Sequence, residues 1–232
     1  MKVSLSPRLR AVAQQVPRGA RVVDVGTDHA HLPIWLLDQG QVEWALGVDV
    51  AVGPLGQARQ QVEACASTVD VRQSDGLSGV DPGEVDCITI CGMGGLTVAG
   101  ILSNAQDVLA HVRRIVVQPQ GMAAEVRSVL LALGWGCVEA CLVAEKKHIY
   151  VVESWEQTDC EPVWDEADLR WGRLTREKPD PLYRAWIERE VEDVDGGLER
   201  LRCAGQDTHP DADALRRERA RLLAELSSIC DV

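Results

Sequence analysis

Several residue types and patterns are missing from this sequence of 232 residues. Phenylalanine is absent and tyrosine occurs only twice, so alanine, valine and leucine must fill most of any interior, with seven tryptophans adding bulk. No apolar run approaches the roughly 20 residues that a membrane-spanning helix needs, so we expect no contact with a membrane. The first fifteen residues are amphipathic, so we also expect no signal peptide.

Cysteine pairs of the CxxC type are also missing, although the chain has eight cysteines. In a chain of this length such usage does not indicate a disulfide framework, and we expect a reducing cytoplasm. Cys87 and Cys91, like Cys137 and Cys141, have the spacing that places each pair on one face of a strand. We expect small buried hydrophobic side chains, with metal ligation as the weaker alternative. The histidines lack acids or cysteines at a matching spacing, so we predict no metal site.

An excess of basic residues is missing as well, because the net charge is −12. This balance argues against a broadly basic protein that coats nucleic acid, but it leaves room for a local basic patch. Candidates for such a patch are Arg8 and Arg10, Lys146 and Lys147, and the arginines between positions 216 and 221. The last group is mixed with acids, so a solvated helix face explains it equally well.

Apolar strands alternate with helical patterns over the first part of the chain. Strands are expected at Arg21–Gly26, Glu43–Val50, Val69–Gln73, Val85–Cys91 and Arg113–Gln118, followed by a hairpin of Cys137–Ala144 and His148–Ser154. Helices are expected at 4–16, 31–37 and 55–66, up to about residue 109 after the fourth strand, and at 123–133. Continuous apolar strands alternating with helices predict an α/β, Rossmann-like, mostly parallel sheet that is covered on both faces and ends in an antiparallel hairpin.

The pattern changes after Ser154. Residues 155–164 are polar and contain proline, so we expect a connector there. Helices are expected at Glu166–Arg176, Pro181–Cys203 and Asp211–Ile229, and the last two should form an antiparallel pair across the break at 205–210. The sequence therefore predicts a nucleotide-binding domain over 1–158 and a helical extension over 159–232.

Acidic residues and glycines follow four of the expected strands. Asp24 and Gly26 end the first strand, Asp49 ends the second, Asp75 and Gly76 follow the third, and Gly92–Gly95 follow the fourth. Open α/β sheets bind ligands beyond the carboxyl ends of their strands. Each feature alone has an ordinary structural explanation as a turn or a helix cap, but four at successive strand ends favour a ligand site.

The run after Gly26 indicates which ligand this site takes. Dinucleotide-binding enzymes use G-x-G-x-x-G to accommodate a pyrophosphate, whereas this chain has G-T-D-H-A-H, with Asp28 at the second glycine. A carboxylate there repels a pyrophosphate, which disfavours an NAD-dependent oxidoreductase, and it tolerates a cationic amine. S-adenosylmethionine is such a ligand; Asp49 is suited to its ribose hydroxyls and Asp75 to its adenine amino group.

These segments carry a resemblance to a known family. D-V-G-T-D-H-A-H-L-P from Asp24, D-G-L from Asp75, I-T-I-C-G-M-G-G from Ile88 and the dipeptide Gln118-Pro119 resemble the bacterial tRNA adenine-22 N1-methyltransferase family. The resemblance covers about residues 4–154, and the family carries a helical, coiled-coil-like extension beyond them. It implies a class I methyltransferase fold and S-adenosylmethionine-dependent transfer of a methyl group to N1 of an adenine in tRNA.

The chain departs from the family at two positions. The family often has Glu where this chain has Asp49, and either acid can hold a ribose. It commonly has Gln-Pro-Asn where this chain has Gln118-Pro119-Gln120, which adds a methylene to any contact made there.

The expected site combines the strand ends with the resemblance. The expected cofactor-binding residues are Asp24, Gly26, Asp49, Asp75, Gly76, Gly92, Met93 and Gly94. The expected substrate-binding residues are Arg8, His29, Gly95, Gln118, Pro119, Lys146 and Lys147. Packing is the alternative role for Met93, helix capping for His29, and a tight strand-to-helix turn for Gly92–Gly95.

Asp28 is the candidate catalytic residue. Adenine N1 is a neutral nitrogen with a lone pair, so its attack on a sulfonium methyl group needs no strong base. The methylated ring is cationic until a proton leaves its exocyclic amine, and a nearby carboxylate would stabilise that charge and accept the proton. Binding of the methionine amino group of the cofactor is the competing role for Asp28.

Three further questions stay open at this point. The same cofactor residues would serve a methyltransferase that acts on a small molecule or a protein instead of tRNA. A non-catalytic binding module, whose C-terminal helices pair with a partner, is a further alternative. The oligomeric state, a monomer or a weak dimer, does not follow from the sequence.

Overall fold

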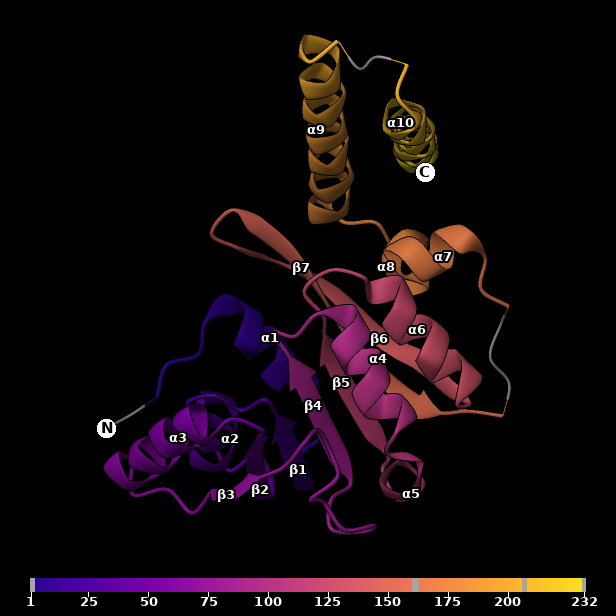
Figure 1. Ribbon diagram of the computed structural model, residues 1–232. Helices are drawn as coiled ribbons and strands as arrows, with labels where there is room; N and C mark the ends of the chain where they lie inside the picture. The colour runs from indigo at the N-terminus through magenta and orange to yellow at the C-terminus, as the bar shows by residue number, and fades with distance from the viewer. Residues whose placement is uncertain (1–2, 160–162, 206–207, 231–232) are drawn as a thin grey trace. The chain divides into compact units, whose positions relative to one another are not determined.

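The computed structural model describes residues 3–159, 163–205 and 208–230 (Figure 1). The chain divides into two compact units, Met1–Leu174 and Thr175–Val232. The first unit runs past the expected domain boundary at residue 158. Cys160 and the side chain of Cys230 lie outside the described part, as do residues 161–162 of the expected connector and 206–207 of the expected helix break.

A seven-stranded sheet forms the centre of the first unit, in the order β3-β2-β1-β4-β5-β7-β6. Its strands are β1 (Ala20–Val25), β2 (Val42–Asp49), β3 (Asp70–Gln73), β4 (Cys87–Cys91), β5 (Arg114–Gln118), β6 (Trp135–Glu145) and β7 (His148–Gln157). The first five are parallel, and β7 pairs antiparallel with both β5 and β6. The predicted Rossmann-like sheet with a closing antiparallel hairpin is confirmed.

Helices cover both faces of this sheet, as continuous apolar strands require. On one face lie α1 (Pro7–Gln15), α2 (His31–Asp38) and α3 (Val52–Ala64), and on the other lie α4 (Gly95–Ser103), α5 (Gln106–Leu109) and α6 (Ala123–Ala132) (Figure 1). Successive strand residues point to opposite faces, so Ile88 and Ile90 pack beneath α4 and α6 while Cys87 packs beneath α1 and α2. Two apolar clusters result, one on each side of the sheet.

Three sequence-based expectations are wrong in detail. Trp155 is not part of a connector: β7 continues to Gln157, and Trp155 is fully buried there, with its ring 5.5 Å from that of Trp164. The helix expected to reach residue 109 is interrupted between α4 and α5. The helix expected over 166–176 is divided at Gly172, whose φ of 88° no helix accepts, into α7 (Glu166–Trp171) and α8 (Arg173–Glu177).

The cysteine pairs illustrate how one inserted residue changes a face. Cys87 and Cys91 pack on the same side of β4, in agreement with their spacing. Cys137 and Cys141 pack on opposite sides of β6, because the register between β6 and β7 shifts between Cys137 and Glu139. The expectation that these two share a face is therefore wrong, and a β-bulge is the reason.

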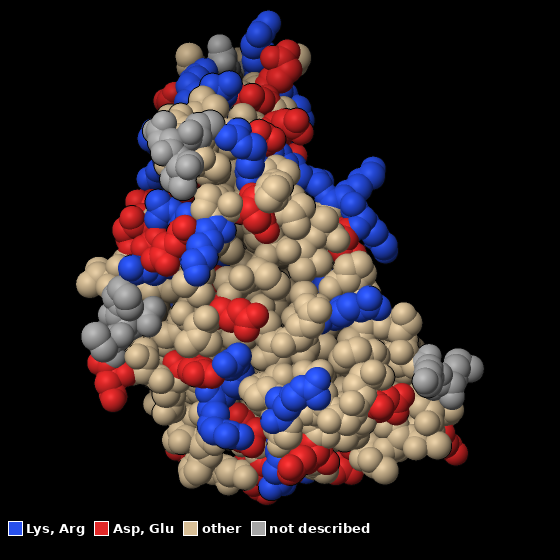
Figure 2. Space-filling model, turned by 180° about the vertical axis from the view of Figure 1, so that it is seen from behind, with Lys and Arg blue, Asp and Glu red and all other residues tan. Residues whose placement is uncertain are grey.

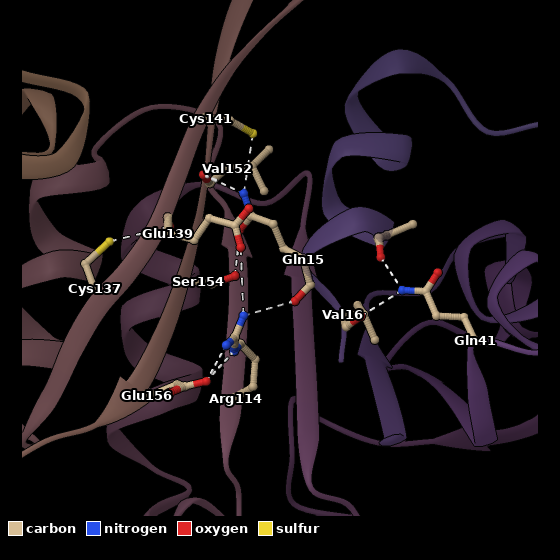
Figure 3. Close-up of polar contacts among 11 residues, drawn as sticks. Gln15, Val16, Gln41, Arg114, Cys137, Glu139, Cys141, Val152, Ser154 and Glu156 are labelled. Atoms are coloured by element: carbon tan, nitrogen blue, oxygen red, sulfur yellow. Dashed lines mark hydrogen bonds and ion pairs between the residues drawn. The ribbon is translucent and has the colours of Figure 1, made fainter. Parts of the chain in front are cut away.

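A polar network fastens the end of α1 to the sheet (Figure 3). The Gln15 side chain is buried; its Nε2 donates to the carbonyl of Val152 at 3.4 Å and its Oε1 accepts from Ser154 Oγ at 2.6 Å. Arg114 Nη1 donates to the Gln15 carbonyl at 3.4 Å, while its other nitrogens pair with Glu156. This network fixes the direction of α1, whose first turn carries Arg8.

The second unit consists of α9 (Pro181–Cys203) packed on α10 (Pro210–Cys230), together with the end of α8. Contacts join Tyr183 to Glu225 and Asp195 to Arg219, so early residues of α9 meet late residues of α10, as in an antiparallel pair. Within the described ranges, no helix has both the length and the apolar character needed to cross a membrane.

Candidate functional site

The candidate site lies where the strand order reverses. The chain proceeds from β1 to β2 and β3 on one side, and then returns to place β4 on the other side of β1. A pocket of about 220 Å³ opens at the carboxyl ends of β1 and β4, where such sheets bind ligands. It is lined by Arg8, Leu9, Asp24, Gly26, Thr27, Asp28, His29, His31, Leu32, Cys91, Gly92 and Gln120.

Gly26 is needed for the shape of this pocket. Its φ of +72° lies in the left-handed region, and a Cβ built there would be 2.1 Å from the Met93 Cε. Its amide donates to the Val48 carbonyl at 2.8 Å, which holds the turn against β2. Met93 itself packs against the apolar cluster beneath α4 and α6. The turn after β1 and the turn after β4 are therefore in direct contact.

Asp24 is a buried carboxyl group at the end of β1. Burial raises its pKa to about 6, although a hydrogen bond from Thr89 Oγ1, 2.7 Å from Oδ1, and the charge of Arg8 act in the opposite direction. The nearby charge of Asp49 raises this pKa further. A cation in the pocket would stabilise the ionised form of Asp24, so the pocket is electrostatically suited to a positively charged ligand.

Asp28 lies at the mouth of the pocket with its side chain 65% exposed. Asp28 and Ala30 both have positive φ, 51° and 54°, a conformation that costs free energy for residues other than glycine and is found at functional sites. The Asp28 Oδ2 is 3.7 Å from His29 Nε2, and the His29 ring stacks on His31 at 5.4 Å. Burial, followed by the neighbouring His29, lowers the pKa of His31, which favours a neutral imidazole.

Arg8 reaches the pocket from α1 and is held from three sides. Its Nη1 donates to Gln118 Oε1 at 2.5 Å, its backbone amide donates to Glu145 Oε2 at 3.0 Å, and its guanidinium lies 5.7 Å from the centre of the Tyr150 ring. The same Gln118 oxygen accepts from the Gly92 amide at 3.2 Å. Gln118 is fully buried and does not line the pocket; it positions two groups that do.

The other expected site residues lie around the pocket and not in it. Asp49 accepts from the amide of Ala51, the residue before α3, at 2.9 Å, and Asp75 is exposed on the turn after β3 beside Gly76. Met93, Gly94 and Pro119 belong to the two loops that follow β4 and β5, and Gly95 is the first residue of α4. Lys146 and Lys147 are exposed in the hairpin turn between β6 and β7.

Sequence reasoning missed several residues that line the pocket. Thr27, Leu32 and His31 lie in the quoted motif after β1, so their proximity had a signal. Gln120 had a signal too, because it stands where the family commonly has Asn, whereas the position of Leu9 depends on the packing of α1. Within the described residues, no group of three or more His, Cys, Asp or Glu side chains is arranged to hold a metal ion.

Basic residues are interspersed with acidic ones on the face shown in Figure 2, which has no continuous basic surface. Near the pocket, Arg8 and the hairpin residues Lys146 and Lys147 are the basic groups that the sequence singles out. The Arg8–Glu145 contact ties the base of this hairpin turn to α1. Any polyanion that reaches the pocket from this side would pass these cations.

Comparisons with known proteins agree on one family. A model described as a methyltransferase domain matches residues 5–152. The chain is 31% identical to the tRNA (adenine(22)-N(1))-methyltransferase of Bacillus subtilis, over 97% of this chain and 98% of that protein. A crystal structure from Streptococcus pneumoniae, described as a putative tRNA (m1A22) methyltransferase, is 30% identical with a TM-score of 0.84, and the match covers 98% of this chain and 99% of that one. A structure of that protein in complex with S-adenosyl-L-methionine matches with a TM-score of 0.82 at 29% identity, over 98% of this chain and 99% of that one.

Proposed function

This chain belongs to the tRNA (adenine(22)-N(1))-methyltransferase family, and we propose that it transfers a methyl group from S-adenosylmethionine to N1 of adenine-22 in tRNA. The observation that carries this proposal is the similarity along almost the whole chain to a protein with that activity. The pocket at the reversal of strand order supports it, because its lining has the carboxylate of Asp28 where a pyrophosphate-binding enzyme has glycine.

The lining fits the charges of this cofactor. S-adenosylmethionine has an ammonium and a carboxylate on its methionine part, and the pocket offers the carboxylates of Asp24 and Asp28 and the guanidinium of Arg8. When bound, the cofactor supplies an electrophilic methyl group on a sulfonium. We assign the ammonium to Asp24, because burial raises the pKa of this carboxyl group and a cation beside it would stabilise the ionised form.

The remaining cofactor assignments follow the strand ends. We assign the ribose hydroxyls to Asp49 and the adenine amino group to Asp75, with Gly26 and Gly92 allowing close approach of the backbone. Gly76 and Met93 support these turns through packing: a Cβ on Gly76 would meet Ile101 at 3.0 Å, and Met93 already contacts Gly26.

This assignment leaves Asp28 available for the substrate. Its side chain is exposed at the mouth, where the base arrives, so it is suited to stabilise the positive charge on the methylated ring and to accept the proton from the exocyclic amine. Much of the remaining acceleration comes from positioning, which supplies up to roughly 7–11 kcal/mol in the best intramolecular models. The base must first leave any stack or pair that holds it in the tRNA.

For the tRNA itself we propose contacts on both parts of the chain. Arg8, His29, Lys146 and Lys147 lie on the pocket side of the methyltransferase domain (residues 1–158), with Gln118 and Pro119 holding the loop beneath. The helical extension (159–232) would add contacts to the phosphate backbone of the tRNA through the arginine side chains of α10. A cytoplasmic location, as for other enzymes that act on tRNA, stays a prediction.

Nucleoside analysis of unmodified tRNA after incubation with the protein and S-adenosylmethionine tests the function directly. We expect 1-methyladenosine in tRNA with adenine at position 22 and none in tRNA with guanine there. Methyl groups found only in protein or metabolite fractions would contradict the proposal and support the alternative acceptor class.

Asp28→Asn tests the role of the exposed carboxylate. Asparagine tolerates the left-handed backbone, so the fold is retained. Loss of the carboxylate should lower kcat by roughly 10²-fold or more, with a small effect on cofactor affinity. An unchanged kcat with a weakened cofactor affinity would instead assign Asp28 to the cofactor.

A further inference from the structure

The glycines after β4 are not equally required by the fold. Gly92 has a φ of +78°, and a Cβ on Gly95 would lie 2.1 Å from the carbonyl oxygen of Met122, so the backbone explains both. Gly94 is different: its φ of −63° and ψ of 144° suit any residue, and a Cβ there would meet nothing within 4 Å. Gly94 is the N-cap residue of α4, and it has no side-chain oxygen to accept a hydrogen bond from the free backbone amides of the first helical turn. The folded chain therefore gives no reason for glycine at position 94.

Two apolar side chains on the segments that follow β4 and β5 are exposed. Leu96, in the first turn of α4, is 60% exposed, and Met122, immediately before α6, is 55% exposed. Met122 also has a φ of +52°, which costs free energy for a residue with a side chain. Single exposed apolar residues are common, but these two lie on segments that contact each other, since the Gly95 amide donates to the Gly121 carbonyl at 3.2 Å.

The same two segments border the pocket. Gly92 and Gln120 line it, and the Gln120 amide donates to the Met93 carbonyl at 2.7 Å, so Gly94, Leu96 and Met122 each lie within four residues of a residue that lines the pocket. A strained, exposed methionine at the rim of a polar pocket suits a flat apolar ligand face, because a thioether makes favourable contacts with aromatic rings.

We infer that Gly94, Leu96 and Met122 form the seat of the target adenine, with the ring lying over the bare backbone of Gly94 between the two apolar side chains. The inference rests on the proposed function, because it takes the ring to be that of the tRNA adenine. Leu96 and Met122 replace some of the stacking that the base loses on leaving the tRNA helix. Because Gly94 has no side chain, a planar ring has room to lie against its backbone next to the pocket. A methyl group at position 94 would fill that space.

Gly94→Ala tests this seat, with Gly100→Ala as the matched control. Gly100 lies on the same helix, is exposed, and would also place its Cβ in open space. Neither variant should lower the melting temperature, which Gly100→Ala should raise slightly because alanine favours a helix interior, and both should keep the affinity of the wild type for S-adenosylmethionine. Only Gly94→Ala should lose methyl transfer to tRNA, by roughly tenfold or more in kcat/KM.

A binding readout separates the seat from the chemistry. We would use tRNA with 2-aminopurine at position 22, whose fluorescence rises when the base leaves its stack, and titrate it with protein without cofactor. The wild type and Gly100→Ala should give the rise, and Gly94→Ala should not. Met122→Ala and Leu96→Ala should each weaken the rise and increase KM for tRNA, with a smaller effect on kcat.

The outcomes distinguish this inference from the proposed function. A wild-type protein that methylates no tRNA overturns the function. A wild-type protein that is active, together with Gly94→Ala and Met122→Ala proteins that match it in fluorescence and KM, overturns the seat alone. If Gly94→Ala does not fold, Met122→Ala and Leu96→Ala decide the question by the same two measurements.

Discussion

The two compact units each place a carboxylate against an arginine, but they do so in different surroundings. In the first unit Arg127 and Glu153 are 2.9 Å apart and 0% and 1% exposed, between α6 and β7. In the second, Arg176 and Glu225 are 3.1 Å apart and 25% and 9% exposed, beside Tyr183. The first pair lies between a helix and a sheet that is covered on both faces, whereas the second lies between helices that bury few large apolar side chains.

This difference indicates what each unit can tolerate. A fully buried charge that loses its partner cannot be solvated, while a partly exposed one can turn to water. Asp24 is a third case, because it is buried in the first unit with a threonine as its hydrogen-bond partner. We therefore expect the substitutions below to change the free energy of unfolding by decreasing amounts, and each tests the first or the second unit.

The largest effect is expected for Arg127→Ala. It leaves Glu153 buried without its cation and also removes the Nη1 hydrogen bonds to the carbonyls of Leu169 (2.8 Å) and Arg170 (2.7 Å), which hold α7. Unpairing a buried ion pair typically costs about 3–5 kcal/mol of unfolding free energy. Urea denaturation followed by tryptophan fluorescence measures it.

A double variant sharpens this test. Arg127→Met combined with Glu153→Leu removes both charges, so it should recover much of the stability lost in the single variant. If the free energy of unfolding of Arg127→Ala is within about 1 kcal/mol of the wild-type value, then burial does not make the loss of the cation costly, and the argument about this pair is wrong.

The second effect has the opposite sign. The raised pKa of Asp24, from 3.8 to about 6, means that the folded protein holds this proton more tightly than the unfolded chain. Stability attributable to Asp24 is therefore greatest below about pH 4, falls as pH rises through about 6, and stays reduced above it. Asp24→Asn should stabilise the protein by up to about 3 kcal/mol near pH 8 and change little near pH 4.

The same variant should bind S-adenosylmethionine more weakly. Asparagine keeps an oxygen for Thr89 but offers no charge to an ammonium. Denaturation at the two pH values and calorimetric titration of the cofactor check both parts. A variant that is less stable near pH 8 would refute the argument that this carboxylate is retained at a cost to the fold.

The sequence could predict the elements whose signals are local. α9 begins at Pro181, behind the capping side chain of Asp180, and its predicted bounds agree with those in the structure. The strand-end residues Asp24, Gly26 and Gly92 line the pocket because parallel strands end at one edge. In contrast, the burial of Trp155 depends on its pairing with Ile115 of β5, which lies far away in the sequence.

The roles that residues take in the site depend on contacts of the same long range. Arg8 enters the pocket only because the Gln15 network fastens α1 to β5 and β7, more than 90 positions away. Gln118 looked like a substrate contact, yet it is buried and supports Arg8 and Gly92. Local patterns identify which residues carry chemistry, but packing decides whether they touch the ligand or hold those that do.

The smallest effect is expected for Glu225→Gln in the second unit. Glutamine still accepts a hydrogen bond from the Tyr183 hydroxyl, which lies 2.7 Å from Glu225 Oε1, but it loses the charge that attracts Arg176. Because the Arg176 side chain is a quarter exposed, water replaces much of that attraction, and we expect a loss of roughly 1 kcal/mol. Hydrogen exchange should show faster opening of α9 and α10 with unchanged protection of the sheet. A loss as large as that of Arg127→Ala would mean that the helical unit depends on its buried polar contacts as strongly as the sheet does, and the contrast between the two units would then not hold.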